Sequence, residues 1–105
     1  MEHFSKWTSA AQAGRDELLT LRRAIHAEPE LGLDCPRTRD KLESALAGLP
    51  LTFRRSDRTS GFVATLEGTL PGRTVLLRGD MDALPIEEAT GLEFASRERM
   101  TRRVN

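Results

Sequence analysis

Apolar residues recur at helical spacing near the start of the chain and predict a first helix over residues 9–27. Leu18, Leu21 and Ile25 fall on one stripe, while most charged residues of this region lie away from it. Pro29 disfavours helical geometry in the residue before it, so the helix is expected to end ahead of that proline.

A second helix is predicted to begin near Pro36, because proline suits the first turn of a helix. Its apolar stripe consists of Leu42, Ala45, Leu46 and Leu49. Gly48 and Pro50 lie at the end of the stripe and are expected to terminate the helix. Each of the two helices would therefore present one apolar side to a neighbouring layer.

Three extended segments are expected after the helices. Residues 51–54 alternate between apolar and polar side chains, as a half-buried strand does, and residues 61–67 read as a second strand between polar turns. Residues 73–78 are apolar on both faces, which favours a central position in a sheet. Two helices followed by three strands predict an α/β fold in which the helices pack on a short sheet.

The composition is that of a small globular domain and argues against several classes of protein. The 105 residues suffice for one domain, and 16 basic residues balance 16 acidic ones, so no overall field favours nucleic acid or an anionic membrane. Cys35 is the sole cysteine, which rules out an intrachain disulfide and suits a reducing compartment. No segment is apolar over the roughly 20 residues that a membrane helix needs, and the N-terminus lacks the pattern of a signal peptide. We therefore expect a soluble cytoplasmic protein.

Asp80 and Asp82 are the main candidate site residues. They lie two residues apart directly after the third predicted strand, so their side chains would point to the same side. Ligands bind at this edge of open α/β sheets, and Pro85 prevents the strand from simply continuing. From the residues alone, the pair could hold a metal, orient a metal ligand or cap a loop, and loop carboxylates are the commonest of these.

Other reactive side chains have plainer interpretations. His26 is interpreted as a helix-end or packing residue, with Glu28 as its neighbour in the sequence. Cys35, in a polar setting before Pro36, is expected to be an unreactive surface thiol. The arginines of residues 97–103 could touch phosphate, but no aromatic residue lies among them, which argues against binding of single-stranded nucleic acid.

Two segments of the chain resemble one family of enzymes. Residues 21–32, L-R-R-A-I-H-A-E-P-E-L-G, resemble the opening of the hippurate hydrolase type of amidohydrolases. Residues 77–91, L-R-G-D-M-D-A-L-P-I-E-E-A-T-G, are similar almost residue for residue to the L-R-A-D-M-D-A-L-P-I-x-E-x-T-G segment of the same family. The family includes N-acyl-amino-acid deacylases, indole-acetyl-amino-acid hydrolases and N-acetyl-diaminopimelate deacetylases, and it belongs with the aminoacylases and zinc carboxypeptidases of metallopeptidase clan MH. The resemblance covers roughly residues 14–96, and Glu28 departs from it, because the family usually has histidine or asparagine there.

The resemblance implies a fold, a reaction and a cofactor. The family fold is an α/β catalytic domain around a twisted mixed sheet, so this chain would be its truncated start: two N-terminal helices packed on a partial mixed β-sheet. The family reaction is hydrolysis of the amide bond of a small N-acyl amino acid. Two divalent metals (Zn, Mn, Co or Ni) activate a water, and a glutamate acts as general base. By resemblance, Asp82 would be the carboxylate that orients a metal ligand, with Asp80 as a further site residue.

The rest of the family's metal site is not expected in this chain. The family's ligands begin with a Met-His-Ala-Cys-Gly-His-Asp segment, and only Met100 matches that segment, at its first residue. Asp80 and Asp82 are too few to hold zinc, which typically takes four ligands. We therefore expect no complete metal site, no bound cofactor and no amide hydrolysis by the isolated chain.

The arginine-rich end of the chain predicts a boundary. The similarity ends near Ser96, and residues 97–105 are aperiodic, as a frameshift followed by an early stop would make them. The chain is interpreted as the N-terminal part of an amidohydrolase catalytic domain over residues 1–96, followed by a divergent, disordered tail. An uncovered edge of the partial sheet would favour self-association. Two alternatives stay open: a non-catalytic binding or regulatory module that pairs with a full-length homologue, and a nucleic-acid contact through the arginine tail.

Overall fold

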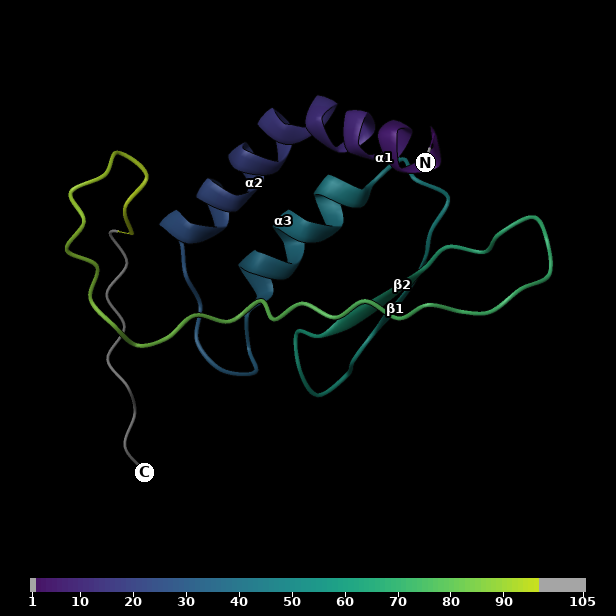
Figure 1. Ribbon diagram of the computed structural model, residues 1–105. Coiled ribbons are helices and arrows are strands. Elements are labelled where there is room, and N and C mark those ends of the chain that lie inside the picture. Colours follow the sequence, from purple (N-terminus) through teal and green to yellow (C-terminus); the bar gives the residue numbers. More distant parts are fainter. Residues whose placement is uncertain (1, 97–105) are drawn as a thin grey trace.

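The computed structural model describes residues 2–96 of the chain, which form a small α/β fold (Figure 1). Three helices come first and two strands follow: α1 (Glu2–Ala13), α2 (Arg15–Ala27), α3 (Pro36–Leu46), β1 (Thr52–Arg55) and β2 (Phe62–Thr65). The predicted fold class and the order of helices before strands are confirmed. The tail predicted over residues 97–105 lies outside the described residues. No helix in the described range is long and apolar enough to cross a membrane.

The first predicted helix is in fact two helices that meet at Gly14. Backbone angles of φ −90° and ψ 5° take Gly14 out of the helical conformation, so α1 ends and α2 begins there. Glycine weakens a helix because its backbone has more freedom to lose. α2 ends at Ala27, and the amide of Glu28 donates to the carbonyl of Ile25 over 3.2 Å. The predicted stop ahead of Pro29 is confirmed.

α3 begins at Pro36, as predicted, and lies alongside α2 (Figure 1). Proline fits this position because the first amides of a helix have no partner within the helix. The helix ends at Leu46, and Gly48 follows with a positive φ of 88°, a conformation that favours glycine. Leu42 is partly buried, whereas Leu49 is exposed, so the predicted apolar stripe is covered only in part.

β1 and β2 form an antiparallel hairpin with the paired residues Thr52–Thr65, Phe53–Ala64, Arg54–Val63 and Arg55–Phe62. Ser56 organises the turn between the strands. Its amide donates to the carbonyl of Gly61 over 2.9 Å, and its hydroxyl accepts the amides of Arg58 and Thr59 at 3.2 Å each. Both strands overlap the segments predicted for them, so two of the three predicted strands are confirmed.

The third predicted strand, residues 73–78, is wrong for this structure. Within the described chain, no backbone hydrogen bond engages residues 66–82, and no strand forms there. A segment that is apolar on both faces suits a central strand, with a strand at each edge and a cover on each face, and β1 and β2 are the two strands that the described residues form. Residues 73–78 therefore stay unpaired, and the sheet has two antiparallel strands instead of the mixed arrangement that was expected.

Polar side chains occupy most of the buried positions. The buried residues of the described chain are Glu30, Cys35, Thr38 and Ser60. Large apolar side chains are instead exposed on α1, on α2 and on both strands. Polar contacts, and not a cluster of large apolar side chains, therefore hold the described parts together.

Candidate functional site

The two segments that resemble the amidohydrolases, residues 21–32 and 77–91, lie side by side although they are far apart in the sequence. Leu31 and Ala83 form an isolated parallel β-bridge, and the amide of Ala83 donates to the carbonyl of Glu30 over 2.8 Å. Figure 1 shows the chain after β2 running back past the start of α3 toward the end of α2. The candidate site is built where these two segments meet.

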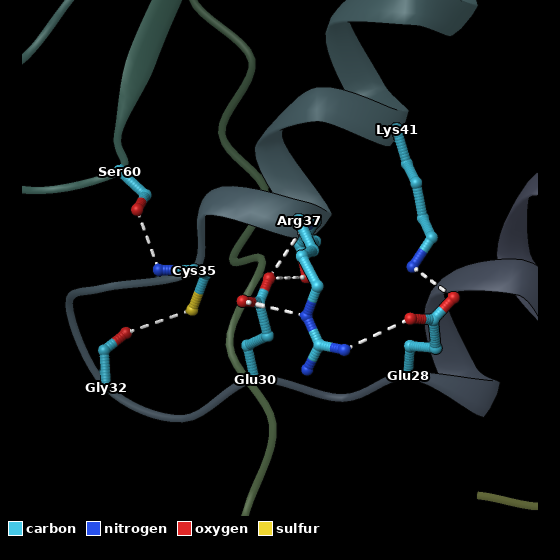
Figure 2. A network of polar contacts seen from close by, with 8 residues as sticks. Glu28, Glu30, Gly32, Cys35, Arg37, Lys41 and Ser60 are labelled. Atoms are coloured by element: carbon cyan, nitrogen blue, oxygen red, sulfur yellow. Dashed lines mark hydrogen bonds and ion pairs between the residues drawn. The ribbon is translucent and has the colours of Figure 1, made fainter. Parts of the chain in front are cut away.

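Glu30 joins the first of these segments to the start of α3. Its carboxylate accepts hydrogen bonds from the amide of Thr38 at 2.6 Å and from the hydroxyl of Thr38 at 2.9 Å. Figure 2 shows Arg37 on the other carboxylate oxygen of Glu30, with Nε at 3.6 Å. Burial acts to raise the pKa of Glu30, but the hydrogen bonds from Thr38 and Arg37 and the charge of Arg37 outweigh it, so the pKa lies below its usual value. An ionised Glu30 thus sits at the positive end of the α3 dipole.

Cys35, which precedes α3, ties that helix to the hairpin. Its amide donates to the hydroxyl of Ser60 over 2.6 Å, and its thiol points back to the carbonyl of Gly32 at 3.4 Å (Figure 2). The pKa of the thiol is raised, first by burial and then by nearby carboxylates that include Glu30 and Asp82. The prediction of a surface thiol is wrong, because these contacts leave Cys35 only 1% exposed.

Glu28, the position at which the chain departs from the family pattern, pairs with α3. Its carboxylate lies 3.1 Å from Nη1 of Arg37 and 3.2 Å from Nζ of Lys41 (Figure 2). His26 hydrogen-bonds with Glu88 and not with its sequence neighbour Glu28. The carboxylate at position 28 therefore pairs the end of α2 with α3 at the surface, where ion pairs contribute little to stability.

An open groove of about 920 Å³ lies between the end of α2 and the second segment. From the α2 side it is lined by Arg22, Ile25, His26, Pro29 and Leu31. The second segment contributes residues 81–88, and Ser96 completes the lining. More than half of these side chains are apolar, with a few charged groups among them.

The structure separates the two predicted site residues. Asp82 lines the groove, whereas Asp80 lies outside the lining and pairs with Arg78, whose Nη2 is 3.0 Å from the Asp80 carboxylate. Arg78 and Asp80 are both exposed, so the ion pair between them is weak. Asp82 is thus the member of the pair that lines the groove.

Glu88 also lines the groove, although the sequence patterns did not single it out. Its carboxylate hydrogen-bonds with the ring of His26 and accepts the hydroxyl of Thr90, and its side chain is only 12% exposed. The hydrogen bond from Thr90 lowers the pKa of Glu88 most, burial opposes it, and His26 lowers it further. The His26 ring also packs edge-on against Phe94, with 6.1 Å between ring centroids. The available signal was the place of Glu88 in the second resembling segment, where it occupies the family's glutamate.

The described residues do not fit a divalent metal site. Within residues 2–96, no group of three or more histidine, cysteine, aspartate or glutamate side chains is arranged to hold an ion. His26 and Glu88, which share the groove with Asp82, bond with each other. Zinc in proteins typically takes four ligands, so no metal-dependent step is assigned to this part of the chain.

Comparison with known proteins finds relatives that share most of this chain. Over 86 residues, or 78% of the chain, it is 41% identical to the N-acetyldiaminopimelate deacetylase of Oenococcus oeni, of which it covers 22%. Over 82 residues, or 78% of the chain, it is 35% identical to YhaA of Bacillus subtilis, provisionally named an amidohydrolase, of which it covers 21%. The chain belongs to this family of amidohydrolases.

The chain spans about a fifth of the length of these amidohydrolases. A third relative, from Rhodococcus jostii, is provisionally named a glutamate–cysteine ligase. The identity is 36% over 91 residues, which is 87% of this chain and 11% of that protein. No protein-family profile and no solved structure matches the chain.

Proposed function

We propose that the chain forms the N-terminal part of the catalytic domain of an amidohydrolase that cleaves the amide bond of an N-acyl amino acid. In this role, Asp82 is the carboxylate that orients a metal ligand, and the groove beside it receives part of the substrate. The observation that carries the proposal is that residues 21–32 and 77–91 meet at the groove that Asp82 lines. These are the two segments that resemble the family.

The names of the relatives support this chemistry. The Oenococcus oeni relative is named for removal of an acetyl group from N-acetyldiaminopimelate, and YhaA is provisionally named an amidohydrolase. The ligase name carries less weight, because the match covers 11% of that protein and leaves room for a ligase active site elsewhere in it. An N-acyl amino acid is therefore the favoured class of substrate.

The proposal assigns no hydrolysis to the 105-residue chain alone. Family resemblance implies two divalent metals, which would supply an activated water, but the described residues hold no matching set of ligands. The chain's own contribution is to orient and to bind: Asp82 and the groove face the substrate, while the backbone carbonyl of Glu30 and the side chain of Glu88 hold the two segments together. The free cysteine suits a reducing compartment, so we propose a cytoplasmic location.

A chimeric enzyme tests the proposal. Residues 14–96 would replace the homologous segment of the Oenococcus oeni deacetylase, and hydrolysis of N-acetyldiaminopimelate would be followed by the release of free amine. We expect the chimera to be active and Asp82→Asn to lower kcat by about 10- to 100-fold, because a metal ligand loses the carboxylate that orients it. Asp57→Asn, in the exposed turn of the hairpin, is the matched control and should change kcat by less than about 2-fold.

Two results would count against this function. One is a folded chimera without activity, and the other is an equal loss of activity in the two aspartate variants. The isolated chain provides a separate check, because we expect no hydrolysis when zinc, manganese, cobalt or nickel is added to it. Turnover by the isolated chain would show that its own residues complete a metal site.

A further inference from the structure

One apolar segment within residues 2–96 is both exposed and unpaired. Residues 74–77, Thr-Val-Leu-Leu, make no backbone hydrogen bond there, and Val75, Leu76 and Leu77 are 82%, 83% and 90% exposed. Consecutive large apolar side chains with such high exposed fractions mark an interaction surface. The segment is also held at both ends, because β2 ends at Thr65 and Ala83 is bridged to Leu31.

We propose that residues 73–78 are the docking surface for the remainder of an amidohydrolase catalytic domain and become a central β-strand when that partner binds. The inference rests on the proposed function, because it takes its partner from the family to which the chain belongs. It adds to that function the surface that the partner occupies. It also adds the change in secondary structure that accompanies binding.

The pattern of side chains shows what the partner must supply. Side chains alternate between the two faces of a strand, so Val75 and Leu77 would cover one face and Leu76 the other. A peptide added at one edge would satisfy one row of backbone groups and leave an apolar face in water. The partner must therefore provide neighbouring strands and a cover for both faces, which requires a body the size of a domain.

The exposed surface of the chain agrees with a partner of this size. Within the described residues, 15 large apolar side chains are exposed, spread along the chain from Phe4 to Leu92. A second copy of the chain in a standard interface would cover only about 800 Å² of each partner. The chain matches 22% of the Oenococcus oeni deacetylase, so that relative contains a body of domain size beyond the matched segment.

Co-expression of the full 105-residue chain with the rest of the deacetylase tests the docking surface. The second chain would be the Oenococcus oeni deacetylase without the segment that this chain matches. We expect a complex with one copy of each chain by size exclusion with light scattering. Amide hydrogen exchange at residues 74–77 should slow by about 100-fold on binding, because these amides would enter a sheet.

A pair of leucine variants distinguishes binding through this segment from nonspecific hydrophobic association. Leu76 and Leu70 are each 83% exposed in the free chain, so a charge at either position should leave the circular dichroism spectrum of the free chain unchanged. Leu76→Glu should weaken the complex by about 100-fold, because it places a charge in the new core. Leu70→Glu, outside the proposed strand, should change the affinity by less than about 3-fold.

Several outcomes would overturn the docking surface. A complex in which the amides of residues 74–77 stay unprotected, or in which both variants bind equally, would place the interface elsewhere. A discrete homodimer that protects this segment would assign it to a second copy, and binding only to the intact deacetylase would indicate a regulatory module. If no complex forms while the chimera is active, the docking surface fails and the proposed function stands. If a complex forms and the folded chimera is inactive, the proposed function fails instead.

Discussion

A single buried carboxylate links the helix and the segment that frame the candidate site. The carboxylate of Glu30 accepts two hydrogen bonds from Thr38 at the start of α3. The backbone carbonyl of Glu30 accepts a hydrogen bond from the amide of Ala83. Asp82 adjoins Ala83 in the chain, so the contacts of Glu30 fix the backbone next to the residue that lines the groove. A buried charge is stable only while its donors remain in place, which makes position 30 sensitive to substitution.

Glu30→Gln should lower the free energy of unfolding by about 2 kcal/mol at pH 7, because glutamine loses the charge and one of the two oxygens that accept hydrogen bonds. Urea melts measure this value. Glu93→Gln, at an exposed position, is the control and should stay within about 0.5 kcal/mol of the parent chain. An equal effect of the two substitutions would contradict a stabilising role for Glu30.

The same substitution should also change how stability depends on pH. The pKa of Glu30 is lowered from 4.5, so below about pH 4.5 the unfolded chain binds more protons at this group than the folded chain does. The contribution of Glu30 is present above that pH and is lost as the pH falls through the folded pKa. Melts between pH 6 and about pH 3 should therefore show the parent chain and Glu30→Gln converging on the acid side. A constant difference across this range would assign the acid loss to other carboxyl groups.

Among the secondary-structure elements, the hairpin is joined to the base of α3 by Ser60. The Ser60 hydroxyl accepts the amide of Cys35 just before the helix, and the Ser60 amide donates to the carbonyl of Leu33 over 2.9 Å. Ser60 and Cys35 are themselves buried, with exposed fractions of 3% and 1%. Arg55 adds an ion pair with Glu43, but it lies at the surface and contributes little. The placement of the sheet relative to the helices therefore depends mainly on Ser60.

Ser60→Ala should lower the free energy of unfolding by about 1–3 kcal/mol, because the buried amide of Cys35 loses its acceptor. Labelling of the Cys35 thiol by an aromatic disulfide reagent should become faster as the connection loosens. Ser44→Ala, at an exposed position of α3, is the matched control and should leave both quantities nearly unchanged. If thiol labelling were equally fast in the parent chain and in Ser60→Ala, the hairpin would not be what buries Cys35.

Periodic patterns predicted the elements that depend on local chemistry, and they failed where an element depends on its neighbours. Pro29 and Pro36 placed the end of α2 and the start of α3, since a proline acts through its own backbone geometry. Residues 73–78 carry the pattern of a central strand, but no pattern within a segment reveals whether a second edge is present to pair with it. The groove could not be predicted for the same reason, because it depends on contacts such as that between His26 and Glu88, which lie 62 residues apart in the sequence.

At the scale of the whole molecule, solution behaviour should follow from the balance of buried and exposed apolar groups. Apolar side chains on α1, on the hairpin and in residues 74–77 lie in water, while the buried positions in the described part are mostly polar. Burial of apolar surface is the main favourable term in folding, so little cooperative stability is expected from this arrangement. Contacts between chains would remove some of the exposed apolar surface from water, without a preferred number of copies.

We expect the free chain to form assemblies whose size grows with concentration, and to unfold over a broad range of temperature. Size exclusion with light scattering and thermal melts at several concentrations measure these two properties. Binding of a hydrophobic dye to the unheated chain should be strong, because apolar surface is already accessible. Co-expression with the truncated deacetylase should replace the assemblies by a one-to-one complex that melts sharply and binds less dye, since the same surface would then be covered. A monodisperse monomer that unfolds cooperatively would contradict this prediction, because it would show that the chain buries enough apolar surface by itself.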